Sequence, residues 1–218
     1  FISLYVAVIL LEGSLSLKFE DIRGHCKTVS NLVSTGALIT WLIIGYSTYH
    51  LLNLPIELAF LFGAIVVVTG PTVIIPMLRI VRPNTKVANV LRWEGIIIVP
   101  LGALLAVLVF DFIISGQQNN ALGMIFLTFG KIIFSGLIIG FVSGWLIGEI
   151  LRKQYVPQYL RNIFTLISVF AIFVISEMIE SESGLLAVTV MGITMANMKD
   201  MDIDNILDFK ESLSVLLI

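Results

Sequence analysis

Long apolar segments alternate with short polar ones along the whole chain. A membrane-spanning α-helix needs about 20 consecutive, mainly apolar residues, and most of these segments approach that length. The pattern predicts helices over residues 1–11, 32–49, 56–78, 95–114, 121–150, 162–179 and 184–198, with another from Ile206. It therefore predicts an all-α polytopic membrane protein. Because both ends of the chain lie inside apolar runs, we interpret residues 1–218 as a single transmembrane domain truncated within helices.

Composition supports a bilayer environment and excludes several other classes of protein. Hydrophobic residues make up 58% of the chain and charged residues 13%, against roughly 45–50% and about 25% in a typical soluble domain. The formal net charge of −2 excludes a nucleic-acid-binding protein held by bulk basicity. A single cysteine, Cys26, excludes an internal disulfide and a cysteine-rich metal site. The chain contains no hydrolase or nucleotide-binding motif, so we expect neither an enzyme nor a cofactor.

Basic residues gather in alternate polar segments. Every lysine and arginine except Lys131 lies in one of four segments, namely before residue 32, between 79 and 92, between 152 and 161, or after 198. The polar segments between these, 49–55, 115–120 and 177–183, contain no lysine or arginine. Cytoplasmic loops of membrane proteins carry the excess of lysine and arginine. We therefore expect a multi-pass protein of the cell membrane with its basic loops in the cytoplasm.

The apolar segment 56–78 contains Thr69-Gly70-Pro71-Thr72 near its middle. Proline removes an amide donor and clashes with the preceding helical turn, and glycine weakens the helix further. These residues predict a discontinuous helix at Thr69–Pro71. Carbonyl groups freed at membrane depth must be satisfied by protein, water or ions, and broken helices form the binding sites of many secondary transporters. Two interpretations stay open here, a plain proline kink and an ion site.

Glu94 stands just before the predicted helix 95–114. In one interpretation, it is a carboxylate stabilised by the helix dipole near a helix N-terminus, with Arg92 as a local partner. In the other, it binds a cation or a proton in a cytoplasmic funnel. Pro100 interrupts the same helix, at a depth close to that of Pro71 if the two helices are neighbours.

Other spacings indicate packing rather than chemistry. Glycines recur at every fourth position of the segment 121–150, as Gly136, Gly140, Gly144 and Gly148. They share one helix face, which another helix can approach closely. Glu149 and Arg152 have the i,i+3 spacing of a local ion pair. We expect Glu12, followed by Gly13, to end the first helix.

Several of these segments resemble the monovalent cation:proton antiporter superfamily, in particular the sodium/proton exchanger family. Residues 69–74, TGPTVI, are similar to the family's Thr-(Asp/Gly)-Pro signature, and residues 91–95, LRWEG, to the opening of its next helix. Residues 182–192 and 11–13 resemble the family as well, so that the resemblance covers nearly the whole chain. It implies an exchanger fold with inverted repeats, a dimerisation part and a moving core. On that pattern the chain is the middle of the transporter, and a second discontinuous helix follows Ile218.

Two positions depart from the family pattern. Many members have aspartate after the threonine of the broken helix, where this chain has Gly70, as in a glycine-bearing branch. Members also carry an ion-binding aspartate five positions after the glutamate, where this chain has Val99. Valine can neither bind a cation nor carry a proton. Either Glu94 takes over this role, or the ion site is altered, or exchange is lost.

Our main hypothesis is a secondary active transporter that exchanges Na⁺ or K⁺ for H⁺ by alternating access. The cation would be bound by the hydroxyls of Thr69 and Thr72 and by freed carbonyls near Gly70 and Pro71, and Glu94 would titrate. The alternative, which Val99 motivates, is a non-exchanging membrane sensor or scaffold on the antiporter fold. A third, weaker hypothesis is an ion channel. The expected partners are the lipid bilayer and a second copy of the chain in a homodimer.

Overall fold

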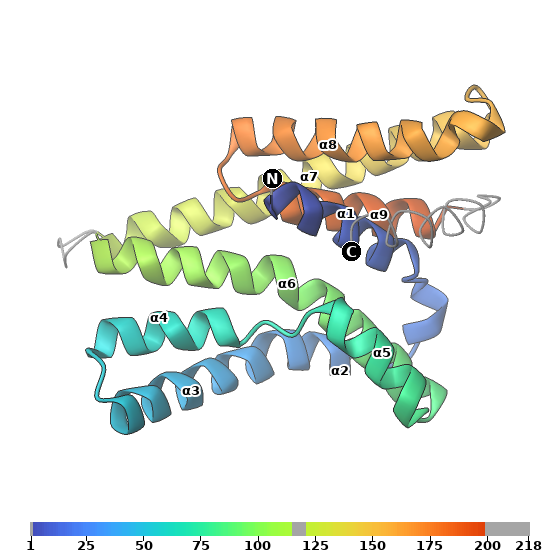
Figure 1. The fold of residues 1–218 in the computed structure, drawn as a ribbon. Coiled ribbons are helices and arrows are strands. Elements are labelled where there is room, and N and C mark those ends of the chain that lie inside the picture. Colours follow the sequence, from blue (N-terminus) through green and yellow to red (C-terminus); the bar gives the residue numbers. More distant parts are fainter. Residues whose placement is uncertain (1, 115–120, 199–218) are drawn as a thin grey trace. The chain divides into compact units, whose positions relative to one another are not determined.

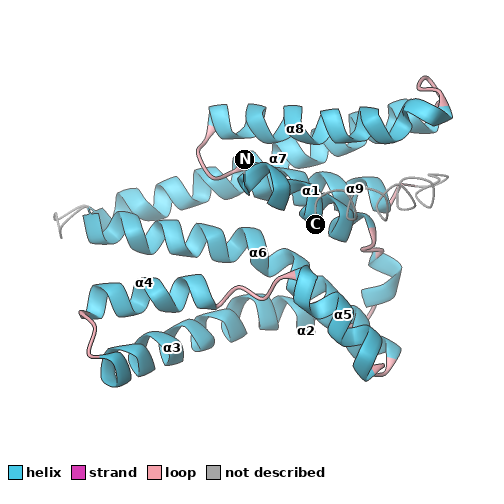
Figure 2. Ribbon diagram, viewed as in Figure 1, coloured by secondary structure: helices cyan, strands magenta, loops and turns pink. Residues whose placement is uncertain are grey.

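The computed structural model describes residues 2–114 and 121–198, and all regular elements in this part are helical (Figure 1 and Figure 2). The longer helices are α1 (Ile2–Leu15), α3 (Ala37–Leu52), α4 (Ile56–Val66), α5 (Pro71–Val81), α6 (Thr85–Ile114), α7 (Ala121–Arg152), α8 (Arg161–Ile179) and α9 (Gly184–Ala196). The shorter elements are η1 (Phe19–Ile22), α2 (Cys26–Asn31), the π-type turn η2 (Leu32–Gly36) and η3 (Gln158–Leu160). The all-α fold is therefore confirmed, and the helix expected from Ile206 lies outside the described residues.

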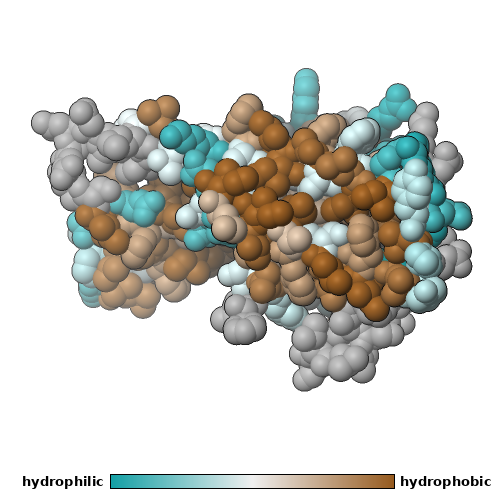
Figure 3. Space-filling view, turned by 90° about the horizontal axis from the view of Figure 1, so that it is seen from above, coloured by the Kyte–Doolittle hydropathy of each residue, from teal (hydrophilic) through white to brown (hydrophobic). Residues whose placement is uncertain are grey.

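The helices are long and apolar enough for a membrane protein. Within the described residues, four stretches could each cross a bilayer, namely Cys26–Leu52, Thr85–Ile114, Leu127–Arg152 and Arg161–Ile179. Helices α4 and α5 form a bent pair that would make a fifth span. Large hydrophobic side chains are exposed on several helices, and Figure 3 shows broad apolar areas on the face that it displays. Such a surface suits hydrocarbon rather than water, and it fits the predicted multi-pass protein.

Helix α6 begins ten residues before the predicted start at Gly95, so that boundary is wrong. Asn84 precedes the helix; its side-chain Oδ1 accepts a hydrogen bond from the amide of Lys86 at 3.2 Å. Its carbonyl accepts another from Ala88 at 2.9 Å. A polar side chain that satisfies a first-turn amide favours a helix start. The basic segment is consequently helical, and Glu94 lies in the third turn rather than at the N-terminus.

The first helix also continues past its predicted end. Glu12 and Gly13 lie inside α1, which ends at Leu15. Ser14 is fully buried, and its hydroxyl donates to the carbonyl of Leu11 at 2.8 Å. A Cβ atom at Gly192 of α9 would collide with the Ser14 side chain, so the two backbones approach closely here. Tertiary packing therefore stabilises a last turn that Glu12-Gly13 alone does not predict.

The chain divides into two compact units. Unit 1 comprises residues 1–19 and 132–218, and unit 2 comprises residues 20–131. The single transmembrane domain expected from the sequence stays a prediction; the two units are subdivisions of the chain defined by its internal contacts.

Unit 1 is built around a core of α1, α7, α8 and α9. Its buried cluster is apolar throughout: Ala7, Leu11, Leu15, Ile147, Leu151, Val169, Phe173, Val188, Met191, Met195 and Ala196. The glycine face of α7 packs on α9, as the spacing predicts. A Cβ atom at Gly144 would lie 2.7 Å from the Met191 carbonyl oxygen, and one at Gly136 would lie 3.0 Å from the Leu186 side chain. Without glycine on this face, α7 and α9 could not come so close.

Unit 2 contains the broken helix and the helices that support it. Helices α3 and α4 pack closely, and a Cβ atom at Gly63 would lie 3.0 Å from the backbone nitrogen of Gly45. Trp41 adds a hydrogen bond from its indole nitrogen to the Phe60 carbonyl at 2.9 Å. Helix α6 in turn contacts both α4 and α5. The two halves of the broken span are thus each held by a neighbouring helix.

Candidate functional site

The predicted break in the helix 56–78 is present. Helix α4 ends at Val66, α5 begins at Pro71, and the two are bent by 52°. Gly70 is extended, with φ −94° and ψ 154°, as expected for a residue that precedes proline. Pro71 occupies the first position of α5, where its missing N–H is not needed. The interruption therefore follows from the covalent structure of Gly70-Pro71.

The break exposes backbone groups that a continuous helix would satisfy. The last carbonyls of α4 and the first amides of α5 have no intrahelical partners. At the start of α5, the Gly70 carbonyl accepts hydrogen bonds from Val73 at 3.1 Å and Ile74 at 3.2 Å. On the other side of the break, the last backbone carbonyls of α4 point away from the helix C-terminus and into the break. Oxygen atoms of this kind are hard ligands suited to alkali cations.

Thr69, in the break, meets Glu94, in α6. The Thr69 hydroxyl donates a hydrogen bond to Glu94 Oε1 at 3.0 Å. In the described part of the chain, this is the hydrogen bond that the Glu94 side chain makes, and Glu94 forms no ion pair with Arg92. Residues two apart on a helix point in different directions, so Arg92 is poorly placed as a partner. The local-pair interpretation of Glu94 is therefore wrong.

Helix α6 lies against both sides of the break through two glycines. A Cβ atom at Gly95 would collide with Ile74 of α5, and one at Gly102 would collide with Val68, just before Thr69. At both contacts the backbone of α6 approaches its neighbour too closely to leave room for a methyl group. The sequence shows both glycines, but it does not show which residues they approach.

Val99 lies between these two contacts. Residues 95, 99 and 102 have the i, i+4, i+7 spacing of a single helix face, and the first and last of them touch the residues flanking the break. Val99 is half-buried on that face. It adjoins the buried Pro100 and lies about one turn before the buried Gly102. Where the family resemblance implies a carboxylate, this chain therefore presents two methyl groups.

The remaining candidates surround Thr69 without joining its hydrogen bond. Pro71 is buried, whereas Thr72 is exposed in the first turn of α5. Within the described residues, Thr72 makes no hydrogen bond with Glu94. The described residues also contain no group of three His, Cys, Asp or Glu side chains that could hold a metal ion. One carboxylate, nearby hydroxyls and backbone carbonyls are the kinds of oxygen ligand that bind alkali cations.

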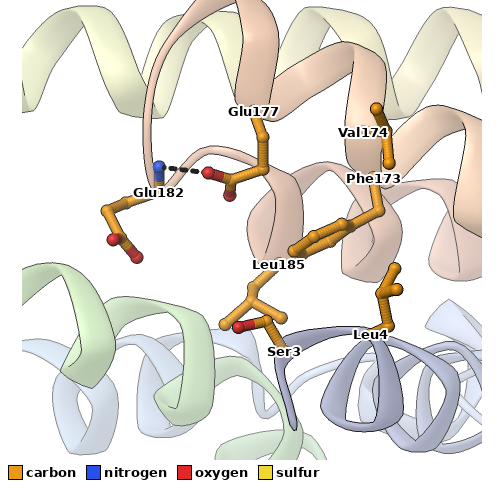
Figure 4. A pocket seen from close by; sticks show the side chains of 7 residues that line it. All are labelled: Ser3, Leu4, Phe173, Val174, Glu177, Glu182 and Leu185. Atoms are coloured by element: carbon orange, nitrogen blue, oxygen red, sulfur yellow. Dashed lines mark hydrogen bonds between the residues drawn. The ribbon is translucent and has the colours of Figure 1, made fainter. Parts of the chain in front are cut away.

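A separate hollow of about 290 Å³ lies in unit 1 (Figure 4). It is lined by Ser3, Leu4, Phe173, Val174, Glu177, Glu182 and Leu185. Its Glu177 carboxylate accepts hydrogen bonds from the amides of Glu182 at 3.0 Å and Gly184 at 3.1 Å, so it closes the turn between α8 and α9. None of the predicted site residues lines this hollow, and of its two glutamates Glu177 serves the turn.

Comparisons with known proteins decide the family. Residues 1–218 match the family model described as sodium/hydrogen exchanger, transmembrane. The chain belongs to this family. Its members are transporters rather than enzymes, and the apolar helices of this member are those of a multi-pass membrane protein.

Similar proteins include several that are named as Na⁺/H⁺ antiporters. The chain is 31% identical to the Na⁺/H⁺ antiporter NhaG of Bacillus atrophaeus over 90% of its own length and 37% of that protein. It is 32% identical to Na⁺/H⁺ antiporter 1 of Methanocaldococcus jannaschii over 95% of its length and 50% of that protein. The solved structure of the sodium proton antiporter MjNhaP1 from the same organism, at pH 8, superposes with a TM-score of 0.80 at 25% identity. That match covers 97% of this chain and 53% of the other.

The exchanger chain described here therefore spans about half, or less, of the length of the relatives that it matches. The partial antiporter fold predicted from the sequence is confirmed by the superposition on a solved antiporter.

Proposed function

We propose that this protein exchanges a monovalent cation, Na⁺ or K⁺, for protons across the cell membrane by alternating access. The observation that carries the proposal is the hydrogen bond between Thr69, in the broken helix, and Glu94, in the helix beside it. Family membership and the names of the relatives support the same class of activity.

The site offers two kinds of group to an ion. Glu94 supplies a carboxylate that can bind either a cation or a proton. The break supplies the hydroxyls of Thr69 and Thr72 and the carbonyls around Gly70 and Pro71, which can replace the water around a dehydrated cation. The Thr69 hydroxyl oxygen lies 3.0 Å from Glu94 Oε1, so the two oxygens are close enough together to coordinate one cation.

Competition at Glu94 then gives antiport. A protonated carboxyl group loses its attraction for a cation, and a bound cation disfavours protonation. Only one of the two occupies the site at a time, so movement of the loaded site in each direction exchanges one for the other. The apparent KM for the cation should rise as the pH falls.

Because position 99 is valine, we assign the competition between cation and proton to Glu94 alone. With valine on the face of α6 that lies between Gly95 and Gly102, no second carboxylate from that position shares the charge. A single titrating group favours exchange of one cation for one proton rather than an electrogenic ratio.

The division of the chain supports distinct roles for its two parts. We assign the ion site to unit 2, which holds the broken helix, and a dimerisation part to unit 1, whose described helices are unbroken. In this proposal the protein is a homodimer in the lipid bilayer, with the basic segments around residues 79–92 and 152–161 facing the cytoplasm.

The test measures how a cation restores the fluorescence of a pH-sensitive dye in everted vesicles. The vesicles come from antiporter-deficient cells that express the full-length protein. We expect Na⁺ or K⁺ to move protons at one or more values between about pH 6 and 9, a range that spans perturbed carboxylates. Wild-type protein that is folded and inserted but moves no protons with either cation would overturn the proposal. Ion flux without coupled proton movement would indicate a channel instead.

Val99 favours a second candidate, a sensor or scaffold that does not exchange ions. A Val99→Asp variant separates the two. Exchange that appears in the variant and is absent from the parent supports the scaffold, because the fold would then lack only the carboxylate. Exchange by the parent itself rejects the scaffold, whatever the variant does.

A further inference from the structure

Arg161, the first residue of α8, is a buried cation without a partner among the described residues. The residue is 8% exposed, and its Nε has no hydrogen-bond partner in the part of the chain that the structure describes. In the same part of the chain, Arg161 takes part in no ion pair. Arginine stays charged at all physiological pH values, and buried charges in proteins are normally paired. We therefore expect an anionic group beside this side chain.

Arg161 belongs to the face of α8 that packs into unit 1. It is buried together with Thr165, Val169 and Phe173, and residues at this four-residue spacing share one helix face. Val169 and Phe173 are members of the buried cluster to which α1, α7 and α9 also contribute. The partner of Arg161 is therefore expected from the protein side of α8 rather than from the surrounding lipid.

The start of α8 lies at about the level where α9 ends. The two helices run in opposite directions and contact each other (Figure 1). Near the turn that joins them, a Cβ atom at Gly184 would lie 2.8 Å from the ring of Phe173. Arg161 is twelve residues before Phe173, and Ala196 is twelve residues after Gly184. At 1.5 Å per residue, both lie about 18 Å from that contact, so the chain leaves α9 close to Arg161.

No acidic side chain in the described part of unit 1 forms an ion pair with Arg161. Glu149, at the end of α7, already binds two basic neighbours, at 2.9 and 3.2 Å. The three glutamates between residues 177 and 182 lie at the other end of α8, about 24 Å or more along the helix axis. Glu12 of α1 is the remaining described acid of this unit, and it is not paired with Arg161. The other acidic residues of unit 1 follow residue 198.

The sequence after α9 carries the charge that Arg161 requires. Residues 200–204, Asp-Met-Asp-Ile-Asp, have an aspartate at every second position, and the first of them comes four residues after Ala196. Four residues of chain span up to about 13 Å, so an aspartate of this segment can reach a guanidinium at the level where α9 ends. Carboxylates this close together repel one another. An arginine relieves that repulsion, and it can bind one carboxylate through two parallel hydrogen bonds.

We propose that the acidic segment 200–204 docks on the end of unit 1 where α8 begins, with one of its aspartates paired with the Arg161 guanidinium. The pair neutralises the buried charge of Arg161, and it holds the chain that leaves α9 against the core of unit 1. The contact is independent of the proposed exchange, because none of its residues belongs to the break in unit 2.

A double-mutant cycle on the purified full-length protein tests the pairing. One arm is Arg161→Gln, and the other is a triple variant with Asp200→Asn, Asp202→Asn and Asp204→Asn. Each arm alone should lower the Tm by several degrees, because each leaves one member of a buried pair without its partner. The variant that combines both arms should be hardly less stable than either arm, since both remove the same interaction.

A second acidic pair in the same part of the chain provides the matched control. Asp208→Asn with Glu211→Gln also removes negative charge after α9, but it leaves the segment 200–204 intact. Its effect on the Tm should simply add to that of Arg161→Gln. Coupling of Arg161 to this control pair instead of to residues 200–204 would overturn the proposal.

Limited digestion with trypsin measures docking directly. Trypsin can cleave after Lys199, next to the acidic segment, and after Lys153, in the exposed turn that follows α7. Arg161→Gln should speed cleavage at Lys199 several-fold, because the undocked segment becomes open to the protease. Cleavage at Lys153 should keep its wild-type rate, which separates undocking from general unfolding.

Two results would overturn the proposal: additive effects of Arg161→Gln and the triple aspartate variant on the Tm, or an unchanged rate of cleavage at Lys199. If Arg161→Gln does not fold, Arg161→Lys takes its place in the cycle, because lysine keeps the charge but loses the two-pronged geometry. Its effect should then be smaller in the triple variant than in the wild type, and an equal effect in both would again overturn the pairing.

Discussion

Units 1 and 2 are both apolar helical bundles, but they use their polar groups differently. In unit 1, Ser183 is fully buried, and its hydroxyl lies within hydrogen-bond distance of the carbonyls of Ser176, at 2.9 Å, and Glu180, at 2.7 Å, one of which accepts its single proton. Glu177 closes the same turn through two backbone amides. Polar side chains here satisfy the protein's own backbone.

In unit 2, the polar groups at the break are left incompletely satisfied. Thr69 is exposed, Glu94 is half-buried, and the bond between them uses one carboxylate oxygen. Glycines occur in both units, but those of α7 bring two continuous helices together, whereas Gly95 and Gly102 bring a helix to a break. The difference is that close packing in unit 1 joins continuous helices, whereas in unit 2 it brings α6 against an interrupted helix, where we propose the ion site.

The largest effect is expected at Glu94. Glu94→Gln keeps the shape of the side chain and an acceptor for Thr69, but the amide cannot carry the proton. We expect exchange to fall by on the order of 100-fold, as is typical when a proton-transferring group is removed, with little change in Tm. The exchange rate is measured as the recovery of dye fluorescence in everted vesicles, normalised to the amount of folded protein.

Glu177→Gln in unit 1 is the matched control for that variant. It replaces one of two acceptors at a turn, so we expect a loss of about 1 kcal/mol in stability and a nearly unchanged exchange rate. If the two variants impair exchange equally, the contrast between the units does not hold.

The second prediction concerns the glycine face of α7. Gly140→Ala places a methyl group against the Ala187 carbonyl and 2.7 Å from Val190 Cβ, which should destabilise the protein by roughly 1–3 kcal/mol. Gly130→Ala, on the same helix, meets nothing within 4 Å, and it should be neutral or stabilising by up to about 1 kcal/mol. Thermal unfolding in detergent compares the two. Equal Tm values for both variants would show that α7 and α9 are not closely packed.

The third prediction tests whether α6 positions the break. Gly102→Ala should push Val68 away and displace Thr69 from Glu94, and we expect exchange to slow by roughly tenfold, equivalent to about 1.4 kcal/mol. Val68→Ala in the same molecule removes the obstructing methyl groups and should restore at least half of the rate. A Gly102→Ala variant that exchanges normally, or a double variant no faster than the single one, would contradict the geometry.

The smallest effect is expected at Asn197, after α9. Its Oδ1 accepts from the Phe19 amide at 2.7 Å, and its Nδ2 donates to the carbonyls of Leu17 at 2.9 Å and Ile193 at 2.8 Å. Asn197→Ala should cost about 1–2 kcal/mol, because each hydrogen bond contributes little net stability. It should also speed hydrogen–deuterium exchange at Phe19. Asn197→Asp keeps the acceptor, so its Phe19 amide should stay protected; loss of protection in both variants would argue against this bond.

Local covalent chemistry explains what was predictable from the sequence. Runs of apolar residues predicted the spanning helices, and the missing amide of Pro71 after Gly70 predicted the break, because both depend on residues adjacent in the chain. The four-residue spacing of glycines predicted the packing face of α7 for the same reason. The i,i+3 spacing of Glu149 and Arg152 predicted their ion pair, which is present at 2.9 Å.

Contacts between distant residues decided the rest. The sequence placed Glu94 at a helix N-terminus beside Arg92 or in an ion site; the structure shows it inside α6 and bonded to Thr69, 25 positions earlier, and the ion site stays a proposal. The extension of α1 beyond Glu12 depends on Gly192, far along the chain. The sequence by itself determined which helices form and where one of them breaks. The tertiary structure decided which side chains meet at the break, because packing at Gly95 and Gly102 selects one approach of α6 among many that the same helices allow.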